Sequence, residues 1–333
     1  MDDWVAVRSV GNDEAAARRL SDVLDSADPD PWRQWLRDAL ARKDWPAVDK
    51  LVHSADLERQ PAATLSFLSA ALRANGKFLI EEPVLRRAQC RYPADFWINL
   101  RLGVSLIWLQ KPNHVLEGIG YSRVAVAVRP QSAPALMCLG LGYAFLGEHD
   151  QAIACYRKSI ELDPKYGRAH SGLGLALWKQ GKLDEAIASY RKAIELDPED
   201  AHAHNNLAWL LATCPEAKFR DAKRAVELAK RAVELNRQEG DNWKTLGVAH
   251  YRAGSWKDAV AGLEKSMELG KGGAAYDWFF LAMAHWQLGK KAEARTRYDQ
   301  AVEWMGKNQP KSEELLRFRA EAEELMKIEQ KKD

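Results

Sequence analysis

The sequence lacks long hydrophobic runs, a leader-like start and an excess of either charge. No stretch of about 18 apolar residues is present, so no segment is predicted to span a bilayer. The start, Met1 to Trp4, lacks the basic-then-apolar plan of a signal peptide, and we therefore expect a cytoplasmic protein with no membrane partner. Lys and Arg number 49 against 47 acidic residues, and a net charge of +2 argues against nucleic acid as the partner.

Cysteine is scarce as well. The four cysteines, Cys90, Cys138, Cys155 and Cys214, form no C-x-x-C pair and fall inside predicted helices or at a helix end. We predict reduced, buried thiols rather than a disulfide framework or a metal site.

Motifs for catalysis are missing too. The sequence has no Gly-rich phosphate loop, no nucleophile elbow and no H-E-x-x-H pair. His202 and His204 are two residues apart, so on a helix they point in different directions and make a poor metal pair. We expect no enzyme activity, no metal and no cofactor.

An internal repeat is present instead. The segment from Asp150 to Pro164 matches the segment from Asp184 to Pro198 at an offset of 34 residues, and Gly147 and Gly181 precede them at the same offset. Such a period predicts pairs of short amphipathic helices, with small residues where their backbones approach and glycine in the turn between them.

The 34-residue period, with Leu139-Gly140 and Leu173-Gly174 in the first helix, resembles the tetratricopeptide repeat (TPR) family. The resemblance implies an all-α fold: a right-handed superhelical solenoid of antiparallel helix pairs. Seven repeats are predicted, at residues 62–95, 96–132, 133–166, 167–200, 201–239, 240–273 and 274–308.

The ends and some repeats depart from this pattern. Residues 1–28 show no repeat and are expected to be a lead segment, 29–61 a degenerate helix pair that caps the array, and 309–333 a C-terminal helix that covers the last repeat. Glu81 stands where the first repeat should have a small residue. Insertions near Lys111 and between Leu211 and Ala225 are either contact loops or neutral additions.

A closer resemblance covers residues 29 to 305. Its carriers are Pro29 to Arg33, Ala41 to Pro46, His204 to Pro215, Gly247 to Gly254 and Asp277 to Trp286. These segments are similar to the C-terminal TPR regions of large bacterial Ser/Thr protein kinases. The kinase motifs themselves are absent, so the resemblance implies either a free-standing adaptor or a piece of a longer polypeptide.

In such arrays the first helix of each repeat lines the concave face, at its second, fifth, sixth, ninth, twelfth and thirteenth positions. We predict a partner-binding site there made of Trp108, Phe145, Trp178, Lys179, Asn205, Asn206, Trp209, Lys244, Tyr251, Arg252, Phe279, Phe280, Met283 and Trp286. Aromatic residues interleaved with cations suit a peptide with apolar anchors and acidic character. The alternative is that several of these rings pack in the core.

The function predicted from these features is a protein–protein interaction scaffold that binds a peptide segment or partner protein on the concave face. The alternative is a regulatory or substrate-docking region of a bacterial Ser/Thr kinase whose catalytic domain is absent from this chain. A single-strand RNA binder would need a basic groove, which the net charge of +2 disfavours.

Overall fold

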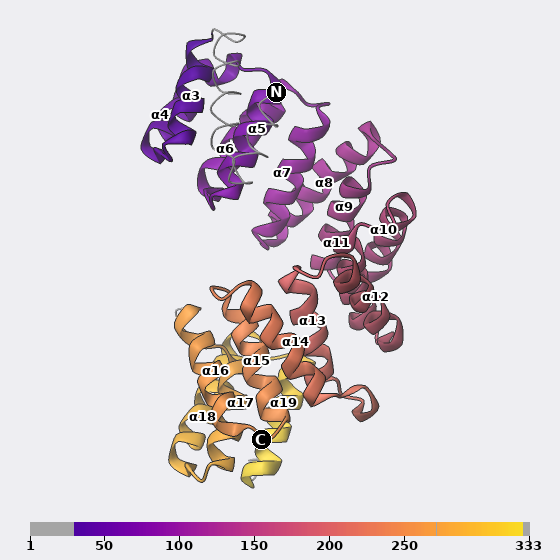
Figure 1. The fold of residues 1–333 in the computed structure, drawn as a ribbon, viewed down its shortest axis with the longest axis vertical. Helices are drawn as coiled ribbons and strands as arrows, with labels where there is room; N and C mark the ends of the chain where they lie inside the picture. Colours follow the sequence, from indigo (N-terminus) through magenta and orange to yellow (C-terminus); the bar gives the residue numbers. More distant parts are fainter. Residues whose placement is uncertain (1–29, 271, 329–333) are drawn as a thin grey trace. The chain divides into compact units, whose positions relative to one another are not determined.

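The computed structural model describes residues 30–270 and 272–328, and these residues are helical apart from short connections (Figure 1). Seventeen α-helices and two 3-10 helices are found in this described part of the chain. Consecutive helices pack as antiparallel pairs, and the all-α fold of helix pairs predicted from the sequence is confirmed. The lead segment expected at residues 1–28 lies outside the described residues. The chain divides into two compact units, an N-terminal unit (Met1–Pro164) and a C-terminal unit (Lys165–Asp333).

The described part of the N-terminal unit holds four helix pairs and one short 3-10 helix. Its elements are α3 (Pro31–Ala41), α4 (Trp45–His53), η1 (Ala55–Arg59), α5 (Ala62–Ala74), α6 (Phe78–Arg91), α7 (Phe96–Trp108), α8 (Pro112–Val128), α9 (Ala133–Phe145) and α10 (His149–Leu162). One hydrophobic core joins α3 and α4 to α5 and α6, where Trp32 and Leu36 pack with Leu68 and Leu72.

The described part of the C-terminal unit holds four further pairs and one last helix. Its elements are α11 (Gly167–Lys179), α12 (Leu183–Leu196), α13 (Ala201–Thr213), η2 (Ala217–Phe219), α14 (Ala222–Leu235), α15 (Gly240–Arg252), α16 (Trp256–Leu269), α17 (Ala275–Gln287), α18 (Lys291–Asn308) and α19 (Glu313–Met326). The repeat boundaries expected from the sequence stay a prediction.

In the seven pairs that follow α3 and α4, the first helices share one length. We call α5, α7, α9, α11, α13, α15 and α17 the A helices, and their pairing partners the B helices. Each A helix has 13 residues. Positions 1 to 13 therefore denote equivalent places in every A helix, counted from its first residue.

Position 8 explains the close packing within a pair. It holds Gly140 in α9 and Gly174 in α11. A Cβ atom at Gly140 would lie 2.9 Å from the ring of Tyr156, and one at Gly174 would lie 2.9 Å from the ring of Tyr190. Both tyrosines are fully buried. The glycine and the tyrosine 16 residues later are thus two halves of one contact, which the 34-residue period repeats.

Glu81 fills the same kind of contact with polar groups. Its side chain is completely buried. Its carboxylate accepts hydrogen bonds from Ser69 Oγ at 2.9 Å, Arg73 Nε at 3.0 Å and Ser105 Oγ at 3.2 Å. Ser69 occupies position 8 of α5, where the other A helices have glycine or alanine. The departure at Glu81 therefore exchanges a small-residue contact for a hydrogen-bonded buried carboxylate.

The expectation of buried thiols is wrong for one cysteine. Cys138 and Cys214 are buried and Cys155 is half-buried, whereas Cys90 is exposed. Cys90 lies in the last turn of α6, on the side that faces away from the core. Burial raises the pKa of the Cys138 thiol to about 11.

Candidate interaction surface

The fourteen residues predicted to bind a partner all fall at A-helix positions 5, 6, 9, 12 or 13. Together with position 2, these define what we call the A-helix face, which each unit has separately. Trp108 and Phe145 belong to the N-terminal unit, and the other twelve belong to the C-terminal unit. The two faces differ, because α19 covers one of them.

In the C-terminal unit, α19 lies against α17 (Figure 1). Its side chains also contact α13 and α15. The ring of Phe318 on α19 makes edge-to-face contacts with Phe280 at 4.9 Å, Tyr276 at 6.2 Å and Trp209 at 6.4 Å between centroids. These rings hold positions 6, 2 and 9 of their A helices. Besides packing on α17, α19 lies on the A-helix face of the two preceding pairs.

Three glutamates of α19 make polar contacts at this interface. Trp209 Nε1 donates a hydrogen bond to Glu314 Oε1 at 3.0 Å. Arg252 and Glu321 form a bidentate ion pair, with Arg252 Nη2 at 2.8 Å from Glu321 Oε2. The hydroxyl of Tyr298 donates to Glu323 at 2.5 Å, which joins α19 to α18. The acidic residues are thus spread along the helix, opposite donors on the three helices α13, α15 and α18.

Cations lie over the aromatic rings of the same face. Lys244 Nζ is 5.7 Å from the ring centroids of both Trp209 and Tyr276. The Arg252 guanidinium lies 5.1 Å from the ring of Phe280 and 5.6 Å from that of Tyr251. Burial raises the pKa of Tyr251 to about 12, so its hydroxyl stays neutral at physiological pH. The predicted interleaving of rings and cations is present, but it binds the chain's own helix.

Several predicted site residues are core residues. Phe279, Phe280 and Met283 have no exposed surface, and Trp209 is 9% exposed. The reason is that α17 is surrounded by α15, α16, α18 and α19. In this structure the first three therefore offer no surface to a partner. Of the other predicted residues, Asn205, Asn206, Trp178, Lys244, Tyr251, Arg252 and Trp286 are half-buried and Lys179 is exposed.

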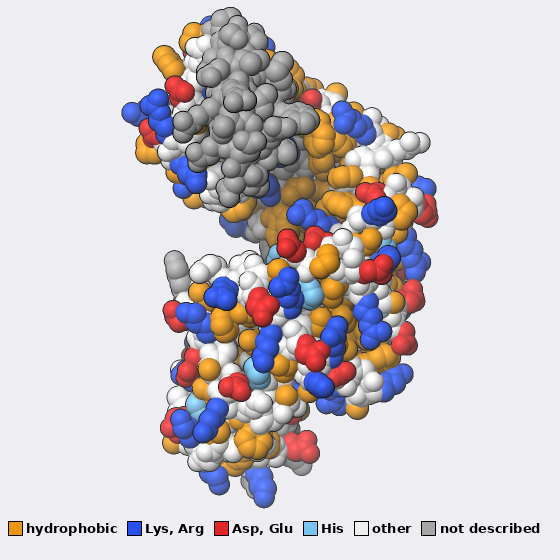
Figure 2. All heavy atoms as spheres, in the orientation of Figure 1, with side chains coloured by type: hydrophobic (Ala, Val, Ile, Leu, Met, Phe, Trp, Pro, Cys, Tyr) orange, Lys and Arg blue, Asp and Glu red, His pale blue; other side chains and the backbone are white. Residues whose placement is uncertain are grey.

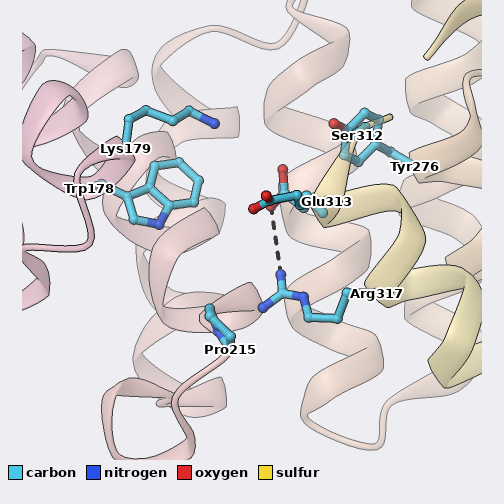
Figure 3. Close-up of a pocket in the computed structure, with 8 residues that line it drawn as sticks. Trp178, Lys179, Pro215, Tyr276, Ser312, Glu313 and Arg317 are labelled. Atoms are coloured by element: carbon cyan, nitrogen blue, oxygen red, sulfur yellow. Dashed lines mark ion pairs between the residues drawn. The ribbon is translucent and has the colours of Figure 1, made fainter. Parts of the chain in front are cut away.

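An open cavity of about 500 Å³ lies beside the first turn of α19 (Figure 3). Trp178 and Lys179, at positions 12 and 13 of α11, face Glu313 and Arg317 across it. Its lining is Trp178, Lys179, Pro215, Tyr276, Ser312, Glu313, Glu314 and Arg317. Glu314 and Arg317 form a loose ion pair at 3.9 Å. Through this cavity, the A-helix face of the C-terminal unit continues beyond the N-terminal end of α19.

The A-helix face of the N-terminal unit is open in the described residues. Trp108 is 52% exposed and Phe145 is 38% exposed, and their rings form an edge-to-face pair at 6.3 Å. Trp97, at position 2 of α7, is also exposed, and it was not among the predicted site residues although position 2 belongs to the predicted face. Figure 2 shows hydrophobic side chains gathered over α7 to α9. Among the described residues, this strip is an exposed aromatic surface.

The buried titratable groups fit a structural role. Burial lowers the pKa of His204, His250 and His285, and raises that of Asp277. His250 and His285 share position 11, and His204 Nε2 lies 3.1 Å from the carbonyl oxygen of Pro198. Within the described residues, no three His, Cys, Asp or Glu side chains are grouped to hold a metal ion, and no helix is long and apolar enough to cross a membrane.

Comparisons with known proteins agree with this architecture. Tetratricopeptide repeat models match residues 139–201 and 177–213, and another such model matches residues 278–307. No curated protein matches the sequence.

Two solved structures share the fold. A chain of the APC/C hetero-tetramer Cut9–Hcn1 is similar with a TM-score of 0.65 and 18% identity, over 92% of this chain and 58% of that one, so this chain spans just over half of its length. PilF of Pseudomonas aeruginosa is similar with a TM-score of 0.53 and 21% identity, over 70% of this chain and 99% of that one.

Consecutive antiparallel helix pairs with a repeated small-residue contact define a helical repeat protein. The 34-residue period and the matched segments identify tetratricopeptide repeats within residues 139–213 and 278–307. Proteins built from these repeats are typically protein–protein interaction scaffolds.

Proposed function

We propose that this protein is an interaction scaffold whose A-helix faces bind segments of a partner protein. The exposed aromatic side chains on the A-helix face of the N-terminal unit, within the described residues, carry the proposal. Trp108 and Phe145 hold position 13 in α7 and α9. The equivalent position in α15 is Arg252, which binds α19. Two exposed rings in contact with each other, at a position that holds a helix elsewhere in the chain, mark a surface suited to an apolar anchor.

The size of the available hydrophobic effect supports this role. A large aromatic side chain buries about 150–250 Å² when fully covered. Since Trp108 is 52% exposed, covering the rest of it removes roughly 100 Å² from water. At about 25 cal/mol per Å², that contributes about 2 to 3 kcal/mol to binding before entropic costs. Phe145 adds a smaller contribution of the same kind.

The partner segment proposed has apolar anchors and acidic residues. In the C-terminal unit, the face that resembles it in position binds α19 through Phe318 and through the carboxylates of Glu314 and Glu321. Aromatic pockets next to Lys and Arg favour such a segment through hydrophobic contact and charge attraction. Binding needs no covalent step.

A capture experiment tests the proposal. Wild type, a Trp108→Ala/Phe145→Ala variant and a Leu116→Ala control are used as baits in lysate of a bacterium that encodes the chain, and bound proteins are identified by mass spectrometry. Leu116 on α8 is 56% exposed, which matches the exposure of Trp108 on a B helix. A partner retained by wild type and Leu116→Ala but lost with the double variant supports the A-helix face. A partner retained equally by all three excludes these two rings as its binding site.

The kinase-linked role stays an alternative proposal. The segments between residues 29 and 305 that resemble kinase-associated TPR regions support it, whereas the comparisons above bear on the repeats alone. The neighbouring coding sequence tests it: a kinase domain in frame directly upstream would support this role, and an unrelated or absent upstream frame would count against it.

A further inference from the structure

The helix α19 binds its own chain in the way a separate helix would. It follows α18 after a short connection, residues 309–312, and its contacts lie on one side only. Leu315, Phe318, Ala322 and Met326 are buried at intervals of three or four residues, whereas Leu316 on the other side is 44% exposed. A single amphipathic helix on the A-helix face is a ligand-like arrangement.

The charges of the two surfaces are complementary. Five glutamates and two arginines lie between Glu313 and Met326, so α19 is acidic. The face beneath it presents Lys244 and Arg252. Arg252 is held in place from below, because its Nε donates to the carbonyl oxygen of Ala212 at 3.1 Å. A positioned guanidinium that binds a carboxylate with two parallel hydrogen bonds is a specific acceptor for an acidic helix.

Three residues of α19 that make polar or ring contacts with the A helices have a regular spacing. Glu314, Phe318 and Glu321 are separated by four and then three residues, which places them along one stripe of a helix. The first binds Trp209, the second enters the ring cluster and the third binds Arg252. The spacing Glu-x-x-x-Phe-x-x-Glu therefore describes what this face recognises.

We propose that the face of α13, α15 and α17 is a binding site for an acidic amphipathic helix of a partner protein with this spacing, and that α19 is its resident competitor. The inference deepens the proposed scaffold role, on which it rests, by naming the partner chemistry at the C-terminal unit. A partner helix that enters the site displaces α19, and α19 reoccupies the site when the partner leaves.

The cavity beside α19 gives the partner an advantage that α19 lacks. Trp178 and Lys179 continue the face beyond the first turn of α19 and are separated from it by open space. A partner helix with one more N-terminal turn would reach both side chains. This added contact is needed because a short tether gives α19 an effective concentration on the order of millimolar, against which a partner must compete.

The test uses the full chain and a fluorescent synthetic peptide with the sequence of residues 309–328, followed by anisotropy. In wild type, α19 occupies the site and the peptide should bind weakly. In a Glu321→Ala variant, and in Phe318→Ala/Glu321→Ala if it keeps wild-type helicity, the peptide should bind at least ten-fold more tightly. Glu324→Ala is the matched control, because Glu324 lies on the same helix and is exposed. Equal affinity for wild type and Glu321→Ala, or no binding to either, would overturn the proposal.

A charge-exchange experiment then tests whether the peptide binds at Arg252. Arg252→Glu added to the Glu321→Ala chain should weaken the native peptide at least ten-fold, and a peptide with Glu321→Arg should restore binding to that chain. If the Glu321→Arg peptide does not restore binding, residue 252 does not contact residue 321 of the peptide, and the proposed recognition of an acidic helix is overturned. Light scattering tests whether a second copy of this chain is the occupant. If Glu321→Ala forms a dimer, the site binds another copy, and the assignment to a partner protein is overturned. None of these readouts involves Trp108 or Phe145, so this inference can fail while the scaffold role at the N-terminal unit stands.

Discussion

Arg252 on α15 and Glu321 on α19 are 69 residues apart in the sequence and form a bidentate ion pair across the A-helix face. The Arg252 side chain is 15% exposed and that of Glu321 is 33% exposed, so water screens the pair only in part. The pair joins the terminal helix to a helix pair that is distant in the sequence, and it is one of the contacts that hold α19 in place.

Reversing one charge of this pair should destabilise the C-terminal unit, and reversing both should restore most of the loss. We expect Arg252→Glu alone to lower the free energy of unfolding by about 2 to 3 kcal/mol, because like charges then meet in a half-buried place. The coupling energy from a double-mutant cycle with Glu321→Arg should be about 1 to 2 kcal/mol. Urea unfolding followed by circular dichroism measures it, and additive single effects would show that the pair contributes nothing.

Two glycines on α8 should respond in opposite directions to alanine. A Cβ at Gly118 would lie 2.8 Å from the carbonyl oxygen of Gly103, whereas nothing lies within 4 Å of a Cβ at Gly120. Gly118→Ala should cost about 1 to 3 kcal/mol because the pair α7–α8 must move apart. Gly120→Ala should stabilise by up to about 1 kcal/mol, since alanine favours the helix. Thermal melts of the two variants check this, and a shift of the same sign in both would contradict the packing described.

Removing the Glu81 carboxylate should destabilise the N-terminal unit far more than changing its neighbour. Glu81→Ala leaves Arg73 without its buried partner and two serine hydroxyls without an acceptor, so we expect a loss of about 2 to 4 kcal/mol. Glu82→Ala removes a half-exposed pair with Arg86 and should cost less than about 1 kcal/mol. Chemical denaturation distinguishes them; equal effects would mean that the buried network is not stabilising.

Mild acid should destabilise the protein through three histidines. Burial lowers the folded-state pKa of His204, His250 and His285 below the unfolded value of about 6.5. The unfolded chain therefore binds more protons, and stability falls as pH drops through about 6.5 towards the folded pKa values. The raised pKa of Asp277 acts with the opposite sign, at pH values above about 3.8.

Melting temperatures between pH 7.5 and 5.5 measure this effect. Replacing the three histidines by glutamine should flatten the profile, and His202→Gln, an exposed position on α13, serves as the control. An unchanged slope in the triple variant would assign the acid sensitivity to other groups.

The helix pairs were predictable because the residues that form the contact within a pair recur at the same positions of successive repeats. Gly140 and Tyr156, like Gly174 and Tyr190, recur at a fixed offset, and glycine follows each of these A helices at Gly147 and Gly181, where φ is 77° and 75°. The backbone of any residue other than glycine is strained at these φ values. Local chemistry of this kind is visible without any knowledge of distant contacts.

The covering of the C-terminal face was not predictable from the same sequence. The pattern of Leu315, Phe318 and Met326 shows that α19 has one apolar stripe, but not which surface it covers. A phenylalanine at the position of Phe280 is expected from the sequence both where it contacts a ligand and where it contacts a neighbouring helix. Only the fold shows that the chain itself supplies the helix, which is why Phe279, Phe280 and Met283 are core residues.

The common length of the A helices bears on how this array can change in evolution. Each ends at its thirteenth residue with its small residue at the eighth, so a duplicated or deleted stretch of one period rejoins helices that already match. Side chains that contact a partner can then be gained or lost one whole repeat at a time, while the helices on either side of the change still pack against each other.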